Sequence, residues 1–107
     1  MSTIHRVLFA TIRKGGPAWD QHRPLRDQNA WREHAEFMDE LFEQGFVVMA
    51  GPLGDGAPEH RVLLILDADS KRAVNDRLAD DPWTAMGVLS TVSIERWEVL
   101  LGDLSDR

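Results

Sequence analysis

The stretch FVVMAGPLGDGAPEHRVLLIL, residues 46–66, decides the fold of this chain. Its two ends, residues 46–50 and 62–66, are apolar at every position, which is typical of strands that are buried on both faces. A loop rich in Gly and Pro, residues 51–59, separates them and continues neither strand. The stretch therefore predicts two buried strands joined by a loop.

The N-terminal segment, residues 4–12, predicts a third buried strand. Alternation places Leu8 and Ile12 on one face and Phe9 and Thr11 on the other, so both faces are largely apolar, as in an interior strand. We expect RKGGP, residues 13–17, to end this strand. The residues up to 28 then form an ordered loop, which Trp19 and Leu25 hold in place.

Two later segments have the period of a helix. Residues 29–44 place apolar side chains in one arc about 120° wide, and Gly45 ends this helix because glycine readily takes a left-handed conformation. Asp69 or Ser70 caps a second helix, which runs to about residue 79 with Val74 and Leu78 on its inner side. Residues 81–87 predict one further helical turn. The apolar residues in the arc of the first helix, residues 29–44, are Trp31, Ala35, Met38, Leu41 and Phe42.

The last predicted strand covers residues 91–101. Its apolar residues change phase between Ile94 and Trp97, so we expect a bulge near Glu95 and Arg96. We expect residues 102–107 to form a frayed tail.

This order of elements, β-α-β-β-α-β, predicts an α+β fold of the ferredoxin-like type, a four-stranded antiparallel sheet with two helices on one face. We expect residues 1–107 to form a single domain with a core from about residue 4 to residue 101. The helices can cover only one face of the sheet, whereas three strands are apolar on both. A homodimer that packs sheet on sheet is the simplest cover, with pockets between sheet and helices or at the dimer edge.

Composition excludes several classes of protein. The chain has 107 residues, a formal net charge of -6 and no Cys. The lack of Cys excludes disulfides and thiol catalysis and is compatible with a reducing cytoplasm, and we see no export signal. No apolar run approaches the roughly 20 residues of a membrane span, and an acidic chain disfavours nucleic acid. We therefore expect a cytoplasmic protein that binds a small-molecule ligand, with no nucleic acid and no membrane as a partner.

His34 is the most unusual polar residue of the sequence. It follows Trp31 by three residues and precedes Met38 by four, so it lies inside the apolar arc of the first helix. A partly desolvated imidazole needs a hydrogen-bond partner and can act as a general base or acid near neutral pH. A buried histidine that bonds to a backbone carbonyl explains the same position.

Asp81 is the carboxylate that we expect to pair with His34. Pro82 pushes it out of helical geometry, which frees its side chain to turn inward at the end of the second helix. Asp as an N-cap before Pro explains the dipeptide by itself, but a carboxylate has two oxygens and both roles can coexist. A carboxylate that accepts from one imidazole nitrogen fixes the tautomer and leaves the other nitrogen facing a substrate.

Other candidate residues carry weaker signals. None of the other histidines stands at metal-pair spacing from His34, so we expect no metal and no cofactor. GPLGDG, residues 51–56, lacks the lysine and the following helix of a phosphate loop and predicts a flexible rim. The four tryptophans either line an aromatic pocket or fill the core. Arg13, Arg23 and Arg26 either bind an anionic substrate or are solvated.

Three motifs of the chain resemble the YCII-related (YciI-like) domain family. They are the helical histidine in WREHAEFM (residues 31–38), the strand end AGP (50–52), and DPW followed by AMG (81–83 and 85–87). The resemblance implies a dimeric α+β barrel and a His-Asp dyad as the active site, which would fall on His34 and Asp81. The activity associated with the family, elimination of chloride from a chlorinated hydroxyaromatic, need not transfer. Shorter members have an Arg-Pro pair just before the histidine, whereas Arg23-Pro24 stands farther away, so we carry no role onto Arg23.

Two hypotheses follow. The first is a small-molecule enzyme, lyase- or isomerase-like and independent of a cofactor, in which His34 transfers a proton and Asp81 orients it. The second is a non-catalytic dimeric module that binds a ligand or acts as an accessory protein. A cofactor-free monooxygenase is less favoured, because the sequence offers no further chemistry to handle oxygen. Under the first hypothesis the substrate contacts are Arg13, Gly51, Pro52 and Trp83, and we expect residues 15–28 to close over the pocket.

Overall fold

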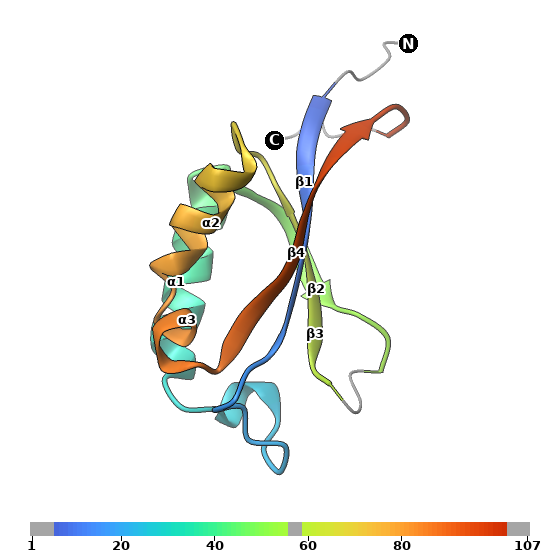
Figure 1. Ribbon diagram of the computed structural model, residues 1–107. Coiled ribbons are helices and arrows are strands. Elements are labelled where there is room, and N and C mark those ends of the chain that lie inside the picture. The colour runs from blue at the N-terminus through green and yellow to red at the C-terminus, as the bar shows by residue number, and fades with distance from the viewer. Residues whose placement is uncertain (1–5, 56–58, 103–107) are drawn as a thin grey trace.

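A computed structural model describes residues 6–55 and 59–102 and shows a twisted sheet with helices on one side (Figure 1). The elements are β1 (Arg6–Gly15), the 3-10 helix η1 (Leu25–Asp27), α1 (Trp31–Glu43), β2 (Val47–Pro52), β3 (Arg61–Leu66), α2 (Lys71–Ala79), α3 (Pro82–Met86) and β4 (Leu89–Val99). Neighbouring strands are antiparallel, in the order β2-β3-β1-β4. This is the α+β, ferredoxin-like arrangement that the sequence predicts.

Strand β1 continues beyond the end that the sequence predicts. Arg13 and Lys14 pair with both β3 and β4, so the expectation that RKGGP ends the strand at residue 13 is wrong. The reason is that a central strand has hydrogen-bonding partners on both sides, and these outweigh the local preference of its residues. The predicted start at residue 4 lies outside the described residues.

Strand β2 includes Gly51 and Pro52, which the sequence analysis placed in the following loop. Proline is tolerated there because β2 is an edge strand. The predicted bulge near Glu95 and Arg96 is also misplaced, because the register of β4 shifts at Val92, opposite Ile12 and Arg13 of β1. From residue 94 onward β4 alternates regularly and bears apolar side chains on both faces, which explains the change of phase without a bulge.

The helices end where local signals predict, and α2 and α3 also begin there, whereas α1 begins at Trp31 and not at Asn29. The Ser70 hydroxyl accepts a hydrogen bond of 3.0 Å from the Ala73 N–H and caps α2, and Gly45 follows α1 with a φ of +82°. Val74 and Leu78 of α2 are buried, whereas Phe42, at the edge of the arc of α1, is half exposed. Within the described parts of the chain, no helix is long and apolar enough to cross a membrane.

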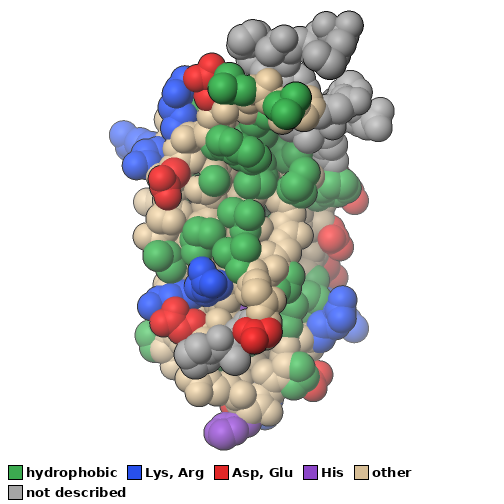
Figure 2. Space-filling view, turned by 90° about the vertical axis from the view of Figure 1, so that its right-hand side faces the viewer, with side chains coloured by type: hydrophobic (Ala, Val, Ile, Leu, Met, Phe, Trp, Pro, Cys, Tyr) green, Lys and Arg blue, Asp and Glu red, His purple; other side chains and the backbone are tan. Residues whose placement is uncertain are grey.

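The sheet carries an apolar cluster on each face. The cluster under the helices includes Phe9, Leu64 and Leu66. The second cluster lies on the face turned away from the helices, which we call the open face, and its buried residues are Leu8, Val48, Ile65 and Val99. Figure 2 looks onto this face and shows hydrophobic side chains gathered along it. Met49 and Trp97, whose register places them on the open face, are 54% and 45% exposed.

Gly16 packs against the turn that follows α3, and this contact gives a test of the fold. A Cβ on Gly16 would lie 2.4 Å from the carbonyl oxygen of Gly87, which accepts a hydrogen bond from the Ala18 N–H. We expect Gly16→Ala to lower the free energy of unfolding by about 1–3 kcal/mol, measured by urea denaturation. Gly51→Ala is the matched control, because the space around its Cβ is open. Equal stability of the two variants would contradict this packing.

Candidate functional site

His34 and Asp81, which the sequence analysis paired, lie in direct contact. Nδ1 of His34 is 2.9 Å from each carboxylate oxygen of Asp81, and the two side chains are 10% and 0% exposed. The imidazole also stacks on Trp83, with ring centroids 3.9 Å apart and planes within 7° of parallel. The stacking and the carboxylate together hold the ring of His34 in one orientation. If the ring is neutral and Nδ1–H donates to Asp81, the lone pair of the imidazole lies on Nε2.

Asp81 accepts hydrogen bonds from three separate parts of the chain. Its Oδ1 accepts from the backbone N–H of Trp83 at 2.9 Å, which makes Asp81 the N-cap of α3, and its Oδ2 accepts from Nη1 of Arg13 at 2.8 Å. His34 provides the third donor. Burial raises the pKa of Asp81, but the hydrogen bonds and the charge interaction with His34 outweigh it, so the pKa lies below its ordinary value. The carboxyl group is therefore ionised at neutral pH, and its roles as cap and as partner of His34 coexist.

Arg13 is the buried cation of this cluster, although the sequence analysis placed it in a loop. Its side chain is 1% exposed, and its Nη2 donates to Oγ1 of Thr84, whose hydroxyl in turn donates to the carbonyl of Leu78 at 2.7 Å. Burial lowers the pKa of Arg13, and the hydrogen bond and charge of Asp81 act against that shift. Two of the guanidinium nitrogens are thus used to join β1 to the region around α3.

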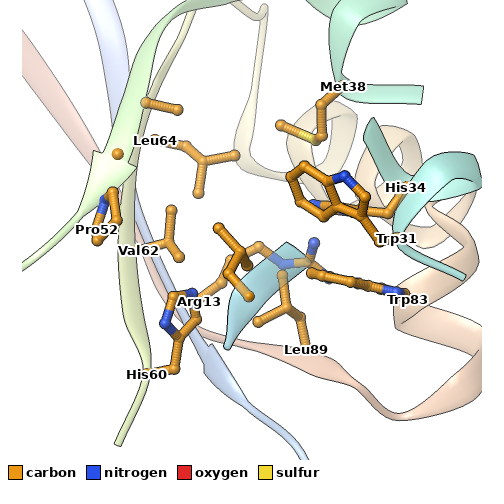
Figure 3. A pocket seen from close by; sticks show the side chains of 13 residues that line it. Arg13, Trp31, His34, Met38, Pro52, His60, Val62, Leu64, Trp83 and Leu89 are labelled. Carbon is orange, nitrogen blue, oxygen red and sulfur yellow. The ribbon is translucent and has the colours of Figure 1, made fainter. Parts of the chain in front are cut away.

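A cavity of about 250 Å³ opens beside the cluster, between the sheet and the helices (Figure 3). Its walls come from η1, α1 and α3 and from the four strands, so no single stretch of sequence forms it. The lining residues are Arg13, Leu25, Trp31, His34, Met38, Ala50, Gly51, Pro52, His60, Val62, Leu64, Trp83 and Leu89. Apart from one arginine and two histidines, these side chains are apolar. The cavity lies at one of the two places where the sequence analysis expected a pocket.

The structure places all four residues expected to contact a substrate, Arg13, Gly51, Pro52 and Trp83, on the wall of this cavity. The other arginines lie elsewhere: Arg23 is exposed and forms an ion pair of 3.4 Å with Asp20, and the guanidinium carbon of Arg26 lies 5.9 Å from the ring centroid of Trp31. Within residues 6–55 and 59–102, no group of three side chains could hold a metal ion.

His60 lines the cavity, but the sequence analysis gave it no role. Its ring stacks on Trp19, with centroids 4.4 Å apart and planes within 8°, and burial lowers its pKa. The signal that could have found it is the alternation of β3, because residues 60, 62 and 64 project to one face of an extended chain. Extending that alternation back by two residues from Val62 would have placed His60 under the helices.

The loop before α1 forms one wall of the cavity. The buried side chain of Gln28 accepts from the Asp20 N–H at 2.9 Å and donates to the carbonyls of Asp20 and Arg23 at 2.7 and 2.8 Å. Trp19 and Leu25 pack on the buried cluster around Trp83. The loop is therefore ordered and held by the two residues that the sequence predicts, and its closure over a ligand stays a prediction.

The comparisons with known proteins agree with the motifs. The family model of the YCII-related domain matches residues 8–98. This range includes the helices, nearly all of the sheet, and the cluster formed by Arg13, His34 and Asp81. A comparison with curated proteins and a comparison with solved structures each give no significant match.

The low pKa of Asp81 makes the stability of the protein depend on pH. Ionised Asp81 favours the folded state, so its contribution is complete above the unfolded pKa of about 3.9 and is lost as the pH falls through the lower folded value. Asp81→Asn removes this titration and leaves Arg13 without its anion, which lowers the free energy of unfolding by about 3–5 kcal/mol at pH 7. In urea denaturation from pH 7 to pH 3, we expect the difference in stability between wild type and Asp81→Asn to become smaller as the pH falls below about 3.9.

Asp76→Asn is the control for this experiment, because Asp76 is 70% exposed on α2. We expect this variant to keep the acid dependence of the wild type. If Asp81→Asn loses stability in acid as steeply as the wild type does, the buried carboxylate is not the group responsible.

Proposed function

This chain belongs to the YCII-related domain family, and we propose that it is a small-molecule enzyme in which His34 transfers a proton with the assistance of Asp81. The observation that carries the proposal is the 2.9 Å contact between Nδ1 of His34 and Asp81, beside an apolar cavity that His34 lines. A neutral imidazole that donates through Nδ1 presents the lone pair of Nε2, which is the form that a general base requires.

Asp81 has two functions in the proposed reaction. It orients the imidazole, and its negative charge stabilises the imidazolium that forms when Nε2 takes a proton. The effect is strengthened because the carboxylate is wholly buried, where charges interact more strongly than in water. If His34 returns the proton to another atom of the substrate, the enzyme is an isomerase. If a leaving group departs from the neighbouring carbon, it is a lyase. Neither course needs a cofactor.

The substrate contacts in this proposal are Arg13, Gly51, Pro52 and Trp83. Trp83 lines the cavity and stacks on His34, so it holds the imidazole in place beside the substrate, whereas Gly51 and Pro52 form the wall on the side of β2. A flat, mainly apolar molecule fits between these surfaces. The loop that contributes Leu25 is the segment that we expect to become more ordered around a ligand.

A second candidate function is a non-catalytic module that binds a ligand. Arg13 favours it, because the guanidinium already neutralises Asp81 and weakens the support that the carboxylate gives to an imidazolium. The donor from Trp83 gives the carboxylate of Asp81 a third hydrogen bond, as is typical of a structural network. In this case His34 and Asp81 would hold each other and a ligand without moving a proton.

We propose that the working form is a homodimer in which two open faces pack together to form a dimeric α+β barrel. Support comes from the apolar cluster on that face and from Met49 and Trp97, whose exposure there is unusual for large apolar side chains. The net charge of -6 is consistent with a small-molecule ligand and with no nucleic acid.

Turnover by variants separates the two candidate functions. Compounds with phenolic, carbonyl or acidic groups are screened with the wild type, and we expect His34→Ala to lower kcat/KM for any substrate found by about 10²–10⁴-fold. Asp81→Asn should also lower it in samples that are folded by circular dichroism. His22→Ala is the control, because His22 lies on the exposed part of the loop. Equal turnover by the wild type and the two site variants would reject the proton transfer.

The mass in solution tests the dimer. Light scattering at low micromolar concentration should give twice the 12.1 kDa of the chain. Trp97→Glu places a charge on the open face and should give a monomer. Met86→Glu changes a residue of α3 that is 42% exposed on the helical side, and it should stay dimeric. A monomeric wild type at this concentration would contradict the proposed packing.

A further inference from the structure

Two residues that line the cavity each have a buried side-chain nitrogen atom with no hydrogen-bond partner among the residues that the structure describes. The two atoms are Nε of Arg13 and Nε2 of His60. Buried polar atoms in folded proteins are almost always bonded, and an unbonded one destabilises the fold. A ligand whose polar atoms reach these nitrogen atoms, after a small adjustment of the side chains, would satisfy both positions.

The register of the sheet places Arg13 and His60 on the same face. Arg13 pairs with Val62 across β1 and β3, and His60 precedes Val62 by two residues. Such diagonal neighbours lie close enough for long side chains to bind one molecule. The carbonyl of His60 accepts from the Gly15 N–H at 2.8 Å, which fixes the backbone at this point. In Figure 3 the ring of His60 lies on the strand side of the cavity and His34 on the helical side.

With His34 in the neutral form that the proposed reaction requires, the polar groups of the cavity carry no unbalanced charge. The guanidinium of Arg13 is paired with Asp81 at 2.8 Å, and burial lowers the pKa of His60, which keeps its ring neutral at pH 7. The rest of the wall is apolar, including Trp31, Met38 and Leu64. A carboxylate would enter this space without an unpaired cation to balance it, which is unfavourable. An uncharged hydrogen-bond acceptor avoids the cost of removing a carboxylate from water.

We propose that the cavity binds an uncharged, mainly apolar carbonyl compound whose carbonyl oxygen accepts from the Nε–H of Arg13 and whose second polar group bonds to His60. This inference rests on the proposed function, because it names the class of substrate on which His34 acts. Arg13 and His34 both contact Oδ2 of Asp81. Because the two side chains meet at one oxygen atom, we expect the carbon next to a carbonyl group bound to Arg13 to lie near the imidazole.

The chemistry of such a substrate follows from this placement. Nε2 of His34 removes a proton from the carbon next to the carbonyl, the C–H electron pair forms a C=C bond, and the π electrons of the C=O bond move onto oxygen. The Nε–H of Arg13 stabilises the resulting enolate oxygen. Collapse of the enolate either takes the proton back from His34 at another carbon of the conjugated system or expels a leaving group from the β carbon. Neither an oxidant nor a reductant is consumed.

Three probes of similar shape test the ligand class without any turnover. They are 4-fluoroacetophenone, which has a neutral carbonyl, 4-fluorobenzoate, which has a carboxylate, and 4-fluoroethylbenzene, which has neither. Titration followed by ¹⁹F NMR should show that the wild type binds the ketone about tenfold more tightly than either of the others. Tighter binding of the benzoate, or equal binding of the ketone and the ethylbenzene, would overturn the inference.

Two variants then assign the contacts. Arg13→Lys keeps a cation for Asp81 but removes Nε–H, so it should abolish the preference for the ketone over the ethylbenzene. His60→Phe keeps an aromatic ring for the stack on Trp19 but removes both nitrogens. It should abolish the tighter binding that we expect of 4-hydroxyacetophenone relative to acetophenone. Circular dichroism checks that each variant is folded, and the ranking of probes by the wild type does not depend on either variant.

The outcomes also separate this inference from the proposed function. A preference of the wild type for the benzoate would overturn the carbonyl ligand and leave the role of His34 untouched. A preference for the ketone combined with undiminished turnover by His34→Ala would overturn the proton transfer and leave the carbonyl site in place.

Discussion

The buried carboxylate of Asp81 is the point at which three distant parts of the chain meet. Arg13 reaches it from β1, His34 reaches it from α1, and the backbone N–H of Trp83 reaches it from the first turn of α3. Each donor satisfies a negative charge that has no access to water, so none of these elements can move away without leaving a buried ion partly unbonded. The position of the helices over this end of the sheet and the geometry of the site therefore depend on the same contact.

The same contact explains why an apolar cavity can lie next to charged residues. The charges of Arg13 and Asp81 cancel each other inside the wall, and Thr84 binds a further guanidinium nitrogen. The cavity is lined mainly by aromatic rings and aliphatic side chains, and two of its lining residues, Arg13 and His60, each have a buried nitrogen atom without a partner among the described residues. In the proposed function, a cavity of this kind would select a ligand by shape and by single hydrogen bonds, and not by net charge.

How much of the fold could be predicted depended on the range of the interactions involved. The caps of the helices at Ser70, Asp81 and Gly45 are local, because each involves residues a few positions apart, and the sequence predicts them at the right positions. The ends of the strands are not local. Arg13 looks like the start of a loop beside Lys14 and two glycines, yet β3 and β4 pair with it on both sides. The bulge predicted near Glu95 and Arg96 is wrong for a similar reason. Ile94 and Val99 of β4 pack into apolar clusters on opposite faces of the sheet, and the sequence shows this only as a change of phase.

The sequence by itself determined the order of the elements, the α+β class, and the two residues at the centre of the site. Apolar periodicity places His34 on the inner side of its helix, and the Asp-Pro dipeptide turns Asp81 inward, both through short-range backbone preferences. Only the tertiary structure decided that Arg13 completes the cluster and that His60 faces the same cavity. Those positions depend on strand pairing across the sheet, between residues separated by 68 positions in the case of Arg13 and Asp81. Alternation along β3 indicates which face of the sheet His60 lies on, but no local pattern shows which side chains the pairing brings together.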